Sequence, residues 1–119
     1  MKSSTYLGMR HSICKSNVIS PETMKLFSIE DRFIIIGRTE NALFAFDNSC
    51  PHMGASLSKS DLRNGNVICY MHSFSYDVFT GKLNGIPEKW INQSSNWKKT
   101  GPLKIIPIFE KKGNVYVEF

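Results

Sequence analysis

Short stretches of apolar residues, separated by turn residues, run along most of the chain. Residues 24–29 alternate apolar and polar positions, whereas Phe33–Ile36 is a continuous run of aromatic and β-branched residues. Segments of about four to eight such residues, bounded by Gly, Asn or Asp, predict β-strands joined by tight turns. The strands predicted in this way are Met24–Ile29, Arg32–Arg38, Ala42–Phe46, Asn66–Tyr70, Tyr76–Phe79, Leu103–Glu110 and Asn114–Phe119.

Turn signals punctuate these strands. An Asn-Gly pair at 64–65 is the strongest hairpin signal in the chain, and a Lys-Gly pair at 112–113 predicts a hairpin between the last two strands. A Thr-Gly turn follows the strand that ends at Phe79. Positive φ angles are expected at three glycines, which are Gly54, Gly81 and Gly85.

The apolar pattern predicts an all-β protein. No stretch keeps a 3.6-residue apolar period over ten or more residues, although residues 87–97 could hold a short helical turn. We therefore expect one domain over residues 1–119, a small antiparallel β-barrel or β-sandwich. Two long excursions leave this scaffold, Asp47–Leu62 and Leu83–Pro102, and long excursions from a compact scaffold often carry function.

Composition narrows the class of protein. The chain has 119 residues, of which 41% are hydrophobic and 21% charged, as in a single globular domain. Its longest apolar run, Phe33–Ile36, is far shorter than the roughly 20 residues of a membrane helix, so no membrane insertion is expected. The net charge of +5 is scattered, without the basic groove of a nucleic-acid binder. The first ten residues lack an apolar signal segment, which predicts a cytoplasmic protein.

Two of the three cysteines have a histidine close by. Cys50-Pro51-His52 and Cys69-Tyr70-Met71-His72 each follow a predicted strand, so two pairs of ligands lie in two turn-rich loops. Without a secretory signal, a disulfide framework is not expected. Cys14 is expected to be a reduced thiol without a role in this site, and His11 a surface residue without a partner.

Two thiolates and two imidazoles admit two main chemistries. One is a single tetrahedral zinc, and the other is a [2Fe–2S] cluster in which two histidines replace two cysteines on one iron. Structural zinc sites usually pair like ligands, Cys with Cys and His with His. Each pair in this chain is mixed, which fits a cluster bridging two loops, while zinc stays an alternative.

The residues around these pairs resemble the Rieske family. The resemblance is carried by residues 50–57, Cys-Pro-His-Met-Gly-Ala-Ser-Leu, and by the later Cys69-x-x-His72. It extends to the strand before the first loop, to the strand and turn at 76–82, and to the closing strand at the C-terminus. A proline loop that shields the cluster in the family is matched by Leu83–Pro87. About residues 24–119 are covered, with cluster-binding loops at about 47–62 and 69–82.

The resemblance implies a fold, a cofactor and a ligand set. The fold is a small Rieske-type antiparallel β-sandwich or barrel with a cluster-binding subdomain built from two loops. One [2Fe–2S] cluster per chain would be bound by Cys50 and Cys69 on one iron and by His52 and His72 on the other. Two neutral imidazoles raise the potential of such a cluster into a band of roughly −150 to +300 mV.

This chain departs from the respiratory branch of the family at several positions. Ala55 and Met71 stand where that branch has a pair of disulfide-forming cysteines, and Phe74 replaces a serine whose hydroxyl lies near the cluster. Tyr76 matches a tyrosine that can donate to a cysteine sulfur, and Ser73 stands where glycine is usual. Losing one donor predicts a potential in the lower half of the band. The residues expected around the ligands are Tyr76, Ser73, Gly54 and Pro87.

The function expected from the resemblance is electron transfer. The chain would carry one electron between a reductase and a terminal oxygenase or similar enzyme, and would not be an enzyme alone. No nucleotide-binding or hydrolase motif is present. Three alternatives stay open: a permanent small subunit of a redox complex like that of assimilatory nitrite reductase, a structural zinc module, and a redox sensor.

Overall fold

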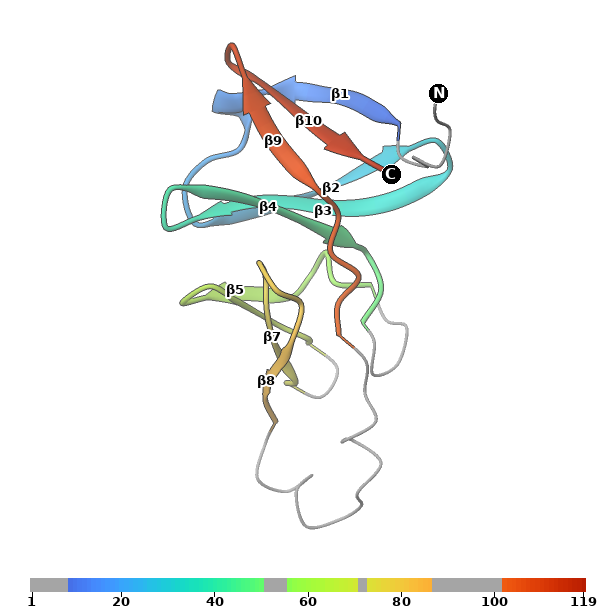
Figure 1. The fold of residues 1–119 in the computed structure, drawn as a ribbon. Helices are drawn as coiled ribbons and strands as arrows, with labels where there is room; N and C mark the ends of the chain where they lie inside the picture. Colours follow the sequence, from blue (N-terminus) through green and yellow to red (C-terminus); the bar gives the residue numbers. More distant parts are fainter. Residues whose placement is uncertain (1–8, 51–55, 71–72, 87–101) are drawn as a thin grey trace.

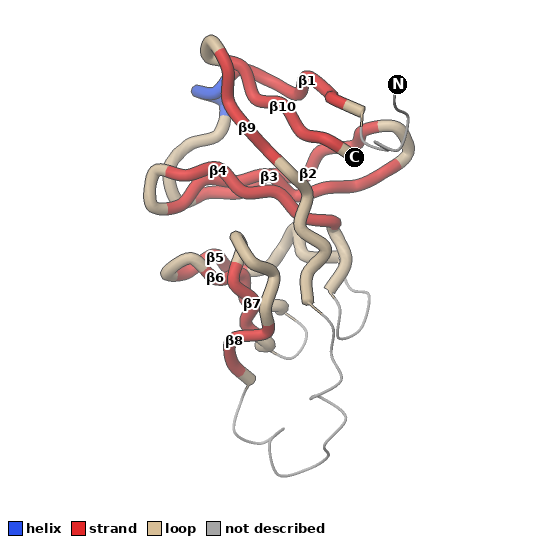
Figure 2. The backbone as a smooth tube through the Cα atoms, in the orientation of Figure 1, coloured by secondary structure: helices blue, strands red, loops and turns tan. Residues whose placement is uncertain are grey.

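The protein is built almost entirely from β-strands. The computed structural model describes residues 9–50, 56–70, 73–86 and 102–119. In these ranges a single short 3₁₀ helix, Ser16–Val18, accompanies the strands (Figure 2). The strands are β1 (Arg10–Lys15), β2 (Thr23–Ile29), β3 (Arg32–Thr39), β4 (Ala42–Asp47), β5 (Asp61–Arg63), β6 (Asn66–Ile68), β7 (Ser75–Asp77), β8 (Leu83–Gly85), β9 (Ile108–Lys111) and β10 (Asn114–Glu118).

The strands form three antiparallel sheets. The terminal sheet has the order β1-β10-β9, the central sheet β2-β3-β4, and the small sheet β5-β6-β7-β8. The central sheet lies between the other two, as Figure 1 shows. This arrangement confirms the expected all-β fold. It also gives the central sheet two buried faces.

The continuous apolar run in β3 follows from this position. Ile34 and Ile36 face the terminal sheet and belong to a core with Val117 of β10, whereas Ile35 faces the small sheet. Along β4 the sides alternate in the same way, since Phe44 and Phe46 join the core of Ile35 and Ala45 joins the other. A strand buried on both faces reads as an unbroken apolar segment rather than as an alternation.

Most predicted strands and turns are confirmed. The predicted strands 24–29, 32–38, 42–46 and 114–119 agree with β2, β3, β4 and β10 to within two residues at each end. The Asn64-Gly65 hairpin joins β5 and β6, with φ of 50° and 78°, as a two-residue turn of the primed type requires. The hairpin at Lys112-Gly113 joins β9 and β10.

Four predictions about strands, excursions and turns were wrong. β1 was not expected, because its residues gain their ladder only from β10, about a hundred positions away. The strand expected over Leu103–Glu110 begins only at Ile108, because Pro107 has no N–H to donate to a ladder. The two excursions are shorter than predicted, because β5 includes the last residues of the first excursion and β8 includes the first residues of the second. Gly85 lies in β8 and does not have a positive φ, whereas Gly81 does.

Side chains join the terminal sheet to the central sheet near the first cysteine loop. Arg32 of β3 donates to the Asp47 carboxylate at 3.0 Å, and its guanidinium lies over the Phe119 ring, 4.3 Å from the centroid. His11 of β1 stacks on that same ring at a centroid distance of 4.3 Å. The expectation that His11 lacks a partner was therefore wrong. The two contacts to Phe119 form only when the C-terminal end of the chain packs against β1 and β3, and the sequence near His11 or Arg32 does not show this packing.

Within the described ranges we find no helix whose length and hydropathy would let it span a bilayer.

Candidate metal centre

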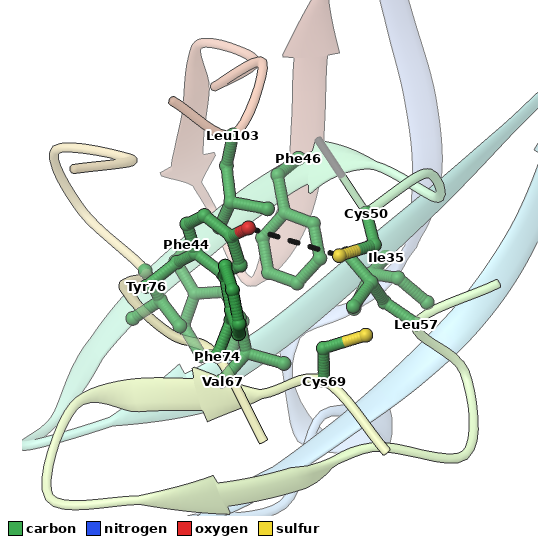
Figure 3. Close-up of a cluster of buried hydrophobic side chains, with 11 residues drawn as sticks. Ile35, Phe44, Phe46, Cys50, Leu57, Val67, Cys69, Phe74, Tyr76 and Leu103 are labelled. Atoms are coloured by element: carbon green, nitrogen blue, oxygen red, sulfur yellow. Dashed lines mark hydrogen bonds between the residues drawn. The ribbon is translucent and has the colours of Figure 1, made fainter. Parts of the chain in front are cut away.

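Cys50 and Cys69 lie together in the core between the central and small sheets. Cys50 follows β4, and Cys69 follows β6 directly. Each is 1% exposed, and both belong to the apolar cluster that includes Ile35, Phe44 and Phe46. Figure 3 shows both sulfur atoms in the same part of this cluster, next to Leu57. Two strands that are distant in sequence thus bring the two thiols to one place.

Cys14 lies elsewhere. It is on β1 and packs against the other core, on the opposite face of the central sheet. Burial raises the pKa of its thiol, while the nearby Lys25 ammonium acts in the opposite direction. All three cysteines lie in the described ranges, and no disulfide joins any two of them. Cys14 is therefore separate from the candidate centre, and its reduced state stays a prediction.

Local hydrogen bonds position the second cysteine. The backbone N–H of Cys69 donates to the carbonyl of Phe74 at 2.9 Å, and the N–H of Ser73 donates to the carbonyl of Cys69 at 2.8 Å. These bonds close the connection from β6 to β7. Ser73 has a φ of 61°, a left-handed conformation that costs a non-glycine residue free energy. Ser73, which stands where the family usually has glycine, therefore carries backbone strain.

The first cysteine is positioned by longer-range contacts. The N–H of Asn48 donates to the carbonyl of Phe33 in β3 at 2.9 Å, which fixes the start of the loop against the central sheet. The Asn48 side chain then binds residues on the far side of the loop, at Ser56 and Leu57. Asn48 is a residue that the sequence pattern did not single out. The sequence feature that could have revealed it is an asparagine two residues before a proposed ligand, with serines at 56 and 58. Asparagine side chains often close turns by hydrogen bonding to nearby residues.

A tyrosine hydroxyl contacts one of the buried sulfurs. The Tyr76 hydroxyl lies 3.8 Å from the Sγ of Cys50 (Figure 3). Tyr76 is on β7 and is 0% exposed, so water does not compete for this contact. A sulfur that carries a thiolate charge accepts from the hydroxyl, which stabilises negative charge on the sulfur. The structure thus brings together three of the residues singled out from the sequence, Cys50, Cys69 and Tyr76.

The other candidate residues lie outside the described ranges. These residues are His52, Gly54, His72 and Pro87. Among the described residues, no group of three or more His, Cys, Asp or Glu side chains is gathered around a common point. The ligand set of two cysteines and two histidines therefore stays a prediction as a whole.

The described residues fit an iron–sulfur cluster chemically. Two thiolates in an apolar core are unstable without a positive counter-charge, because transfer of an ion from water is costly. The described members of this core are apolar side chains together with Tyr76, and none of them is a cation. Iron would supply the charge, and thiolate is its preferred ligand in such clusters. The Tyr76 hydroxyl, 3.8 Å from the Cys50 sulfur, is a donor group close enough to stabilise the same charge.

The chain is similar to known proteins of the Rieske type. A family model described as the Rieske [2Fe-2S] domain matches residues 9–107, most of the chain. The 3-phenylpropionate/cinnamic acid dioxygenase ferredoxin subunit of Photorhabdus laumondii subsp. laumondii is 34% identical over 79 residues. That match covers 66% of this chain and 65% of the relative, slightly less than two thirds of the relative's length.

Two further relatives have related names. A naphthalene 1,2-dioxygenase system ferredoxin component of Pseudomonas putida is 27% identical over 94 residues, covering 79% of this chain and 84% of the relative. Sulredoxin of Sulfurisphaera tokodaii is 29% identical over 90 residues, covering 76% and 80%. Both matches extend over most of each protein, so the similarity is not confined to a short motif.

Solved structures show the same fold. The ferredoxin of carbazole 1,9a-dioxygenase from Nocardioides aromaticivorans IC177 has a TM-score of 0.75 and 16% identity, covering 91% of this chain and 95% of that one. This likeness establishes the fold. With the family match over residues 9–107, it shows that the chain belongs to the Rieske [2Fe-2S] domain family, whose cofactor is a Rieske-type [2Fe–2S] cluster.

Proposed function

We propose that this protein is a Rieske-type ferredoxin that carries one electron between a reductase and a terminal oxygenase or similar redox enzyme. Cys50 and Cys69 bind one iron of its cluster, and His52 and His72 bind the other. The observation that carries the proposal is the burial of Cys50 and Cys69 side by side in one apolar core. Each has a histidine two or three positions later in the sequence.

The cluster supplies a reversible one-electron couple, with a potential raised by the two neutral imidazoles. The chain itself provides the environment. Cys50 and Cys69 present thiolates from two different loops, and the surrounding aromatic side chains exclude water. The Tyr76 hydroxyl donates to the Cys50 sulfur and favours the more negative, reduced state.

The names of the relatives support the role of a carrier. They describe ferredoxin subunits or components of dioxygenase systems. One structural neighbour, with a TM-score of 0.74 and 24% identity, is titled a complex of reduced oxygenase and oxidized ferredoxin. A carrier of this kind passes electrons to an enzyme and is not a catalyst by itself. A single domain over residues 1–119 and a cytoplasmic location stay predictions.

The alternatives make different predictions. A permanent redox subunit would co-purify with a partner at fixed stoichiometry, and a zinc module would bind one colourless metal ion. A sensor would change its binding to a target with cluster state. The relatives described above are all named as ferredoxins or sulredoxin, which favours the carrier.

The test is cluster analysis of protein purified without air. We expect about two irons and about two sulfides per chain, a red-brown colour, and a rhombic EPR signal on reduction. Cys50→Ser, Cys69→Ser, His52→Ala and His72→Ala should each abolish or alter that signal, whereas Cys14→Ser should leave it unchanged. A colourless protein with one zinc per chain would contradict the proposal. Single-turnover reduction by a reductase, followed by electron delivery to an oxygenase, then tests the carrier role.

A further inference from the structure

Hydrogen bonds connect the two cysteine-bearing loops to each other. We propose that Asn48 and Ser60 are positioning residues that hold these loops in a fixed relation, through the backbone of Leu57. In this way they set the geometry in which Cys50 and Cys69 bind the cluster. The inference rests on the proposed function and deepens it. In the described contacts, the side chains of Asn48 and Ser60 bind residues near the cysteines and not the cysteines themselves, so both would act on the ligands indirectly.

Asn48 closes the first loop. Its Oδ1 accepts from the N–H of Leu57 at 2.7 Å and from the Ser56 hydroxyl at 3.2 Å, and its Nδ2 donates to that hydroxyl at 2.9 Å. Its own backbone N–H is bound to Phe33 of the central sheet. Asn48 precedes Cys50 by two positions, and Leu57 follows Cys50 by seven. One side chain therefore ties together the two ends of the segment that contains the first thiol.

Leu57 is the point where the connections meet. Its N–H is held by Asn48, and its carbonyl accepts from the N–H of Ser60 at 3.1 Å. Its side chain is 0% exposed and lies in the same core as Cys50 and Cys69 (Figure 3). A shift of the Leu57 backbone would therefore move a side chain that packs in the same cluster as the two sulfurs.

Ser60 extends the connection to the second loop. Its hydroxyl oxygen accepts from the backbone N–H of Tyr70 at 3.2 Å, and Tyr70 directly follows Cys69. Tyr70 is 53% exposed, so the backbone of this residue, and not burial of its ring, makes the connection to Ser60. A path of hydrogen bonds thus runs from Asn48 through Leu57 and Ser60 to Tyr70, linking the neighbours of both cysteines.

Such a connection matters for electron transfer. Groups that orient metal ligands from outside the ligand set typically change metal affinity or activity by about 10–100-fold when removed. Ligands that are held in one geometry give one spectroscopic species and a single potential, whereas loosely held ligands give a distribution. The predicted consequence of breaking the path is therefore faster loss of the cluster together with broader EPR lines.

The experiment compares five single variants and one double variant with the unaltered protein, all loaded with cluster. Asn48→Ala and Ser60→Ala each remove one link, while Asn48→Asp keeps the acceptor for Leu57 and Ser60→Thr keeps the hydroxyl. The matched control is Asn114→Ala, which breaks a 3.3 Å bond from the Asn114 side chain to the Lys112 carbonyl at the β9–β10 hairpin of the terminal sheet. The measurements are the rate of bleaching in excess iron chelator, the EPR line width of the reduced protein, and the midpoint potential.

We expect Asn48→Ala and Ser60→Ala to bleach about tenfold faster than the unaltered protein, with broadened EPR lines. Asn48→Asp and Ser60→Thr should bleach at rates within about twofold of that of the unaltered protein, because each keeps the hydrogen bond to the backbone N–H of Leu57 or Tyr70. In the double variant Asn48→Ala/Ser60→Ala the effects should be less than multiplicative, because both residues act on one peptide segment.

Two results would overturn the positioning role. One is that the alanine variants at 48 and 60 have bleaching rates and EPR line widths equal to those of Asn114→Ala. The other is that Asn48→Asp and Ser60→Thr bleach as fast as the alanine variants and have equally broad EPR lines. That result would mean that any substitution at these positions disturbs folding, whether or not the hydrogen bond is kept. A failure of the proposed function looks different, since the unaltered protein would then hold no iron or sulfide at all.

Discussion

The hydroxyl of Tyr76 and the sulfur of Cys50 are 3.8 Å apart in a core from which water is excluded. Tyr76 comes from β7 of the small sheet, and Cys50 follows β4 of the central sheet. The pair therefore forms only when the two sheets are packed together. This places a hydrogen-bond donor beside one of the proposed cluster ligands, and the donor can be removed without changing the shape of the core.

Tyr76→Phe should lower the reduction potential. The reduced cluster is more negative, so it gains more than the oxidised cluster from a donor to sulfur. A differential loss of about 1 kcal/mol corresponds to a fall of about 40 mV, since about 59 mV is a tenfold change for a one-electron couple. Protein-film voltammetry measures this directly. Tyr116→Phe, in the terminal sheet, is the control and should leave the potential unchanged. A potential equal to that of the unaltered protein would show that the hydroxyl does not interact with the bound sulfur.

Ser73→Gly should stabilise the protein. Ser73 has a φ of 61°, where a Cβ costs about 1–2 kcal/mol and glycine does not incur this cost. The greater entropy of glycine in the unfolded chain offsets part of the gain, which leaves about 0.5–1 kcal/mol. The expected result is a rise of about 2–5 °C in the thermal unfolding midpoint. Ser73→Ala keeps the Cβ and is the control. If Ser73→Ala raises the midpoint as much as Ser73→Gly does, the hydroxyl and not the backbone strain is responsible.

Gly81→Ala and Gly113→Ala separate strain from crowding. Both glycines have positive φ, of 81° and 78°, so either alanine would cost about 1–2 kcal/mol of backbone strain. At Gly81 an added Cβ would also lie 2.5 Å from the Leu103 carbonyl oxygen, whereas nothing lies within 4 Å at Gly113. Because the N–H of Leu103 donates to the Gly81 carbonyl at 2.8 Å, this crowding should displace the segment that enters the core.

The expected loss of stability is therefore about 2–4 kcal/mol for Gly81→Ala and about 1 kcal/mol for Gly113→Ala. Thermal unfolding followed by circular dichroism distinguishes these values, and Gly81→Ala should also release its cluster at a lower temperature. Equal losses in the two variants would mean that the Leu103 segment moves away without penalty.

Cys14 should react slowly with alkylating reagents at neutral pH. Desolvation raises the pKa of its thiol, with Lys25 opposing the shift, so the reactive thiolate is rarer than for a thiol with the ordinary pKa of about 8.5. The alkylation rate should rise with pH through that higher pKa. Lys25→Gln removes the opposing charge and should slow the reaction further. Mass spectrometry of the modified chain measures the rate, and alkylation as fast as in a denatured sample would contradict the prediction.

The raised pKa of Cys14 also makes folding stability depend on pH. Because the folded chain keeps the Cys14 proton to a higher pH than the unfolded chain does, folding stability falls as the pH rises above about 8.5 towards the folded pKa. Cys14→Ser removes that contribution. The slope of unfolding free energy against pH in this window should therefore be shallower for Cys14→Ser than for the unaltered protein.

The central sheet could be predicted because its signals are local. The runs in β2, β3 and β4, and the Asn64-Gly65 and Lys112-Gly113 turns, combine strand-forming residues with turn residues at short range. By contrast, β1 has a mixed sequence, and its residues become a strand by pairing with β10 at the other end of the chain. Residues 103–106 looked like part of a strand, but they pair with β4 only through an isolated bridge from Ile105 to Phe46, with Leu103 in one core and Ile106 in the other.

The sequence by itself predicted the all-β class and the central strands, because these depend on residue types at short spacing, and its resemblance to the Rieske family pointed to the family and to the four proposed ligands. Only the tertiary structure decided that Cys50 and Cys69 share a core from which Cys14 is separated by the central sheet. Only it placed the Tyr76 hydroxyl beside one sulfur and linked the two loops through Asn48, Leu57 and Ser60. The physical reason is that such contacts join residues from different strands, and their distances are set by how the sheets pack, which residue spacing does not encode.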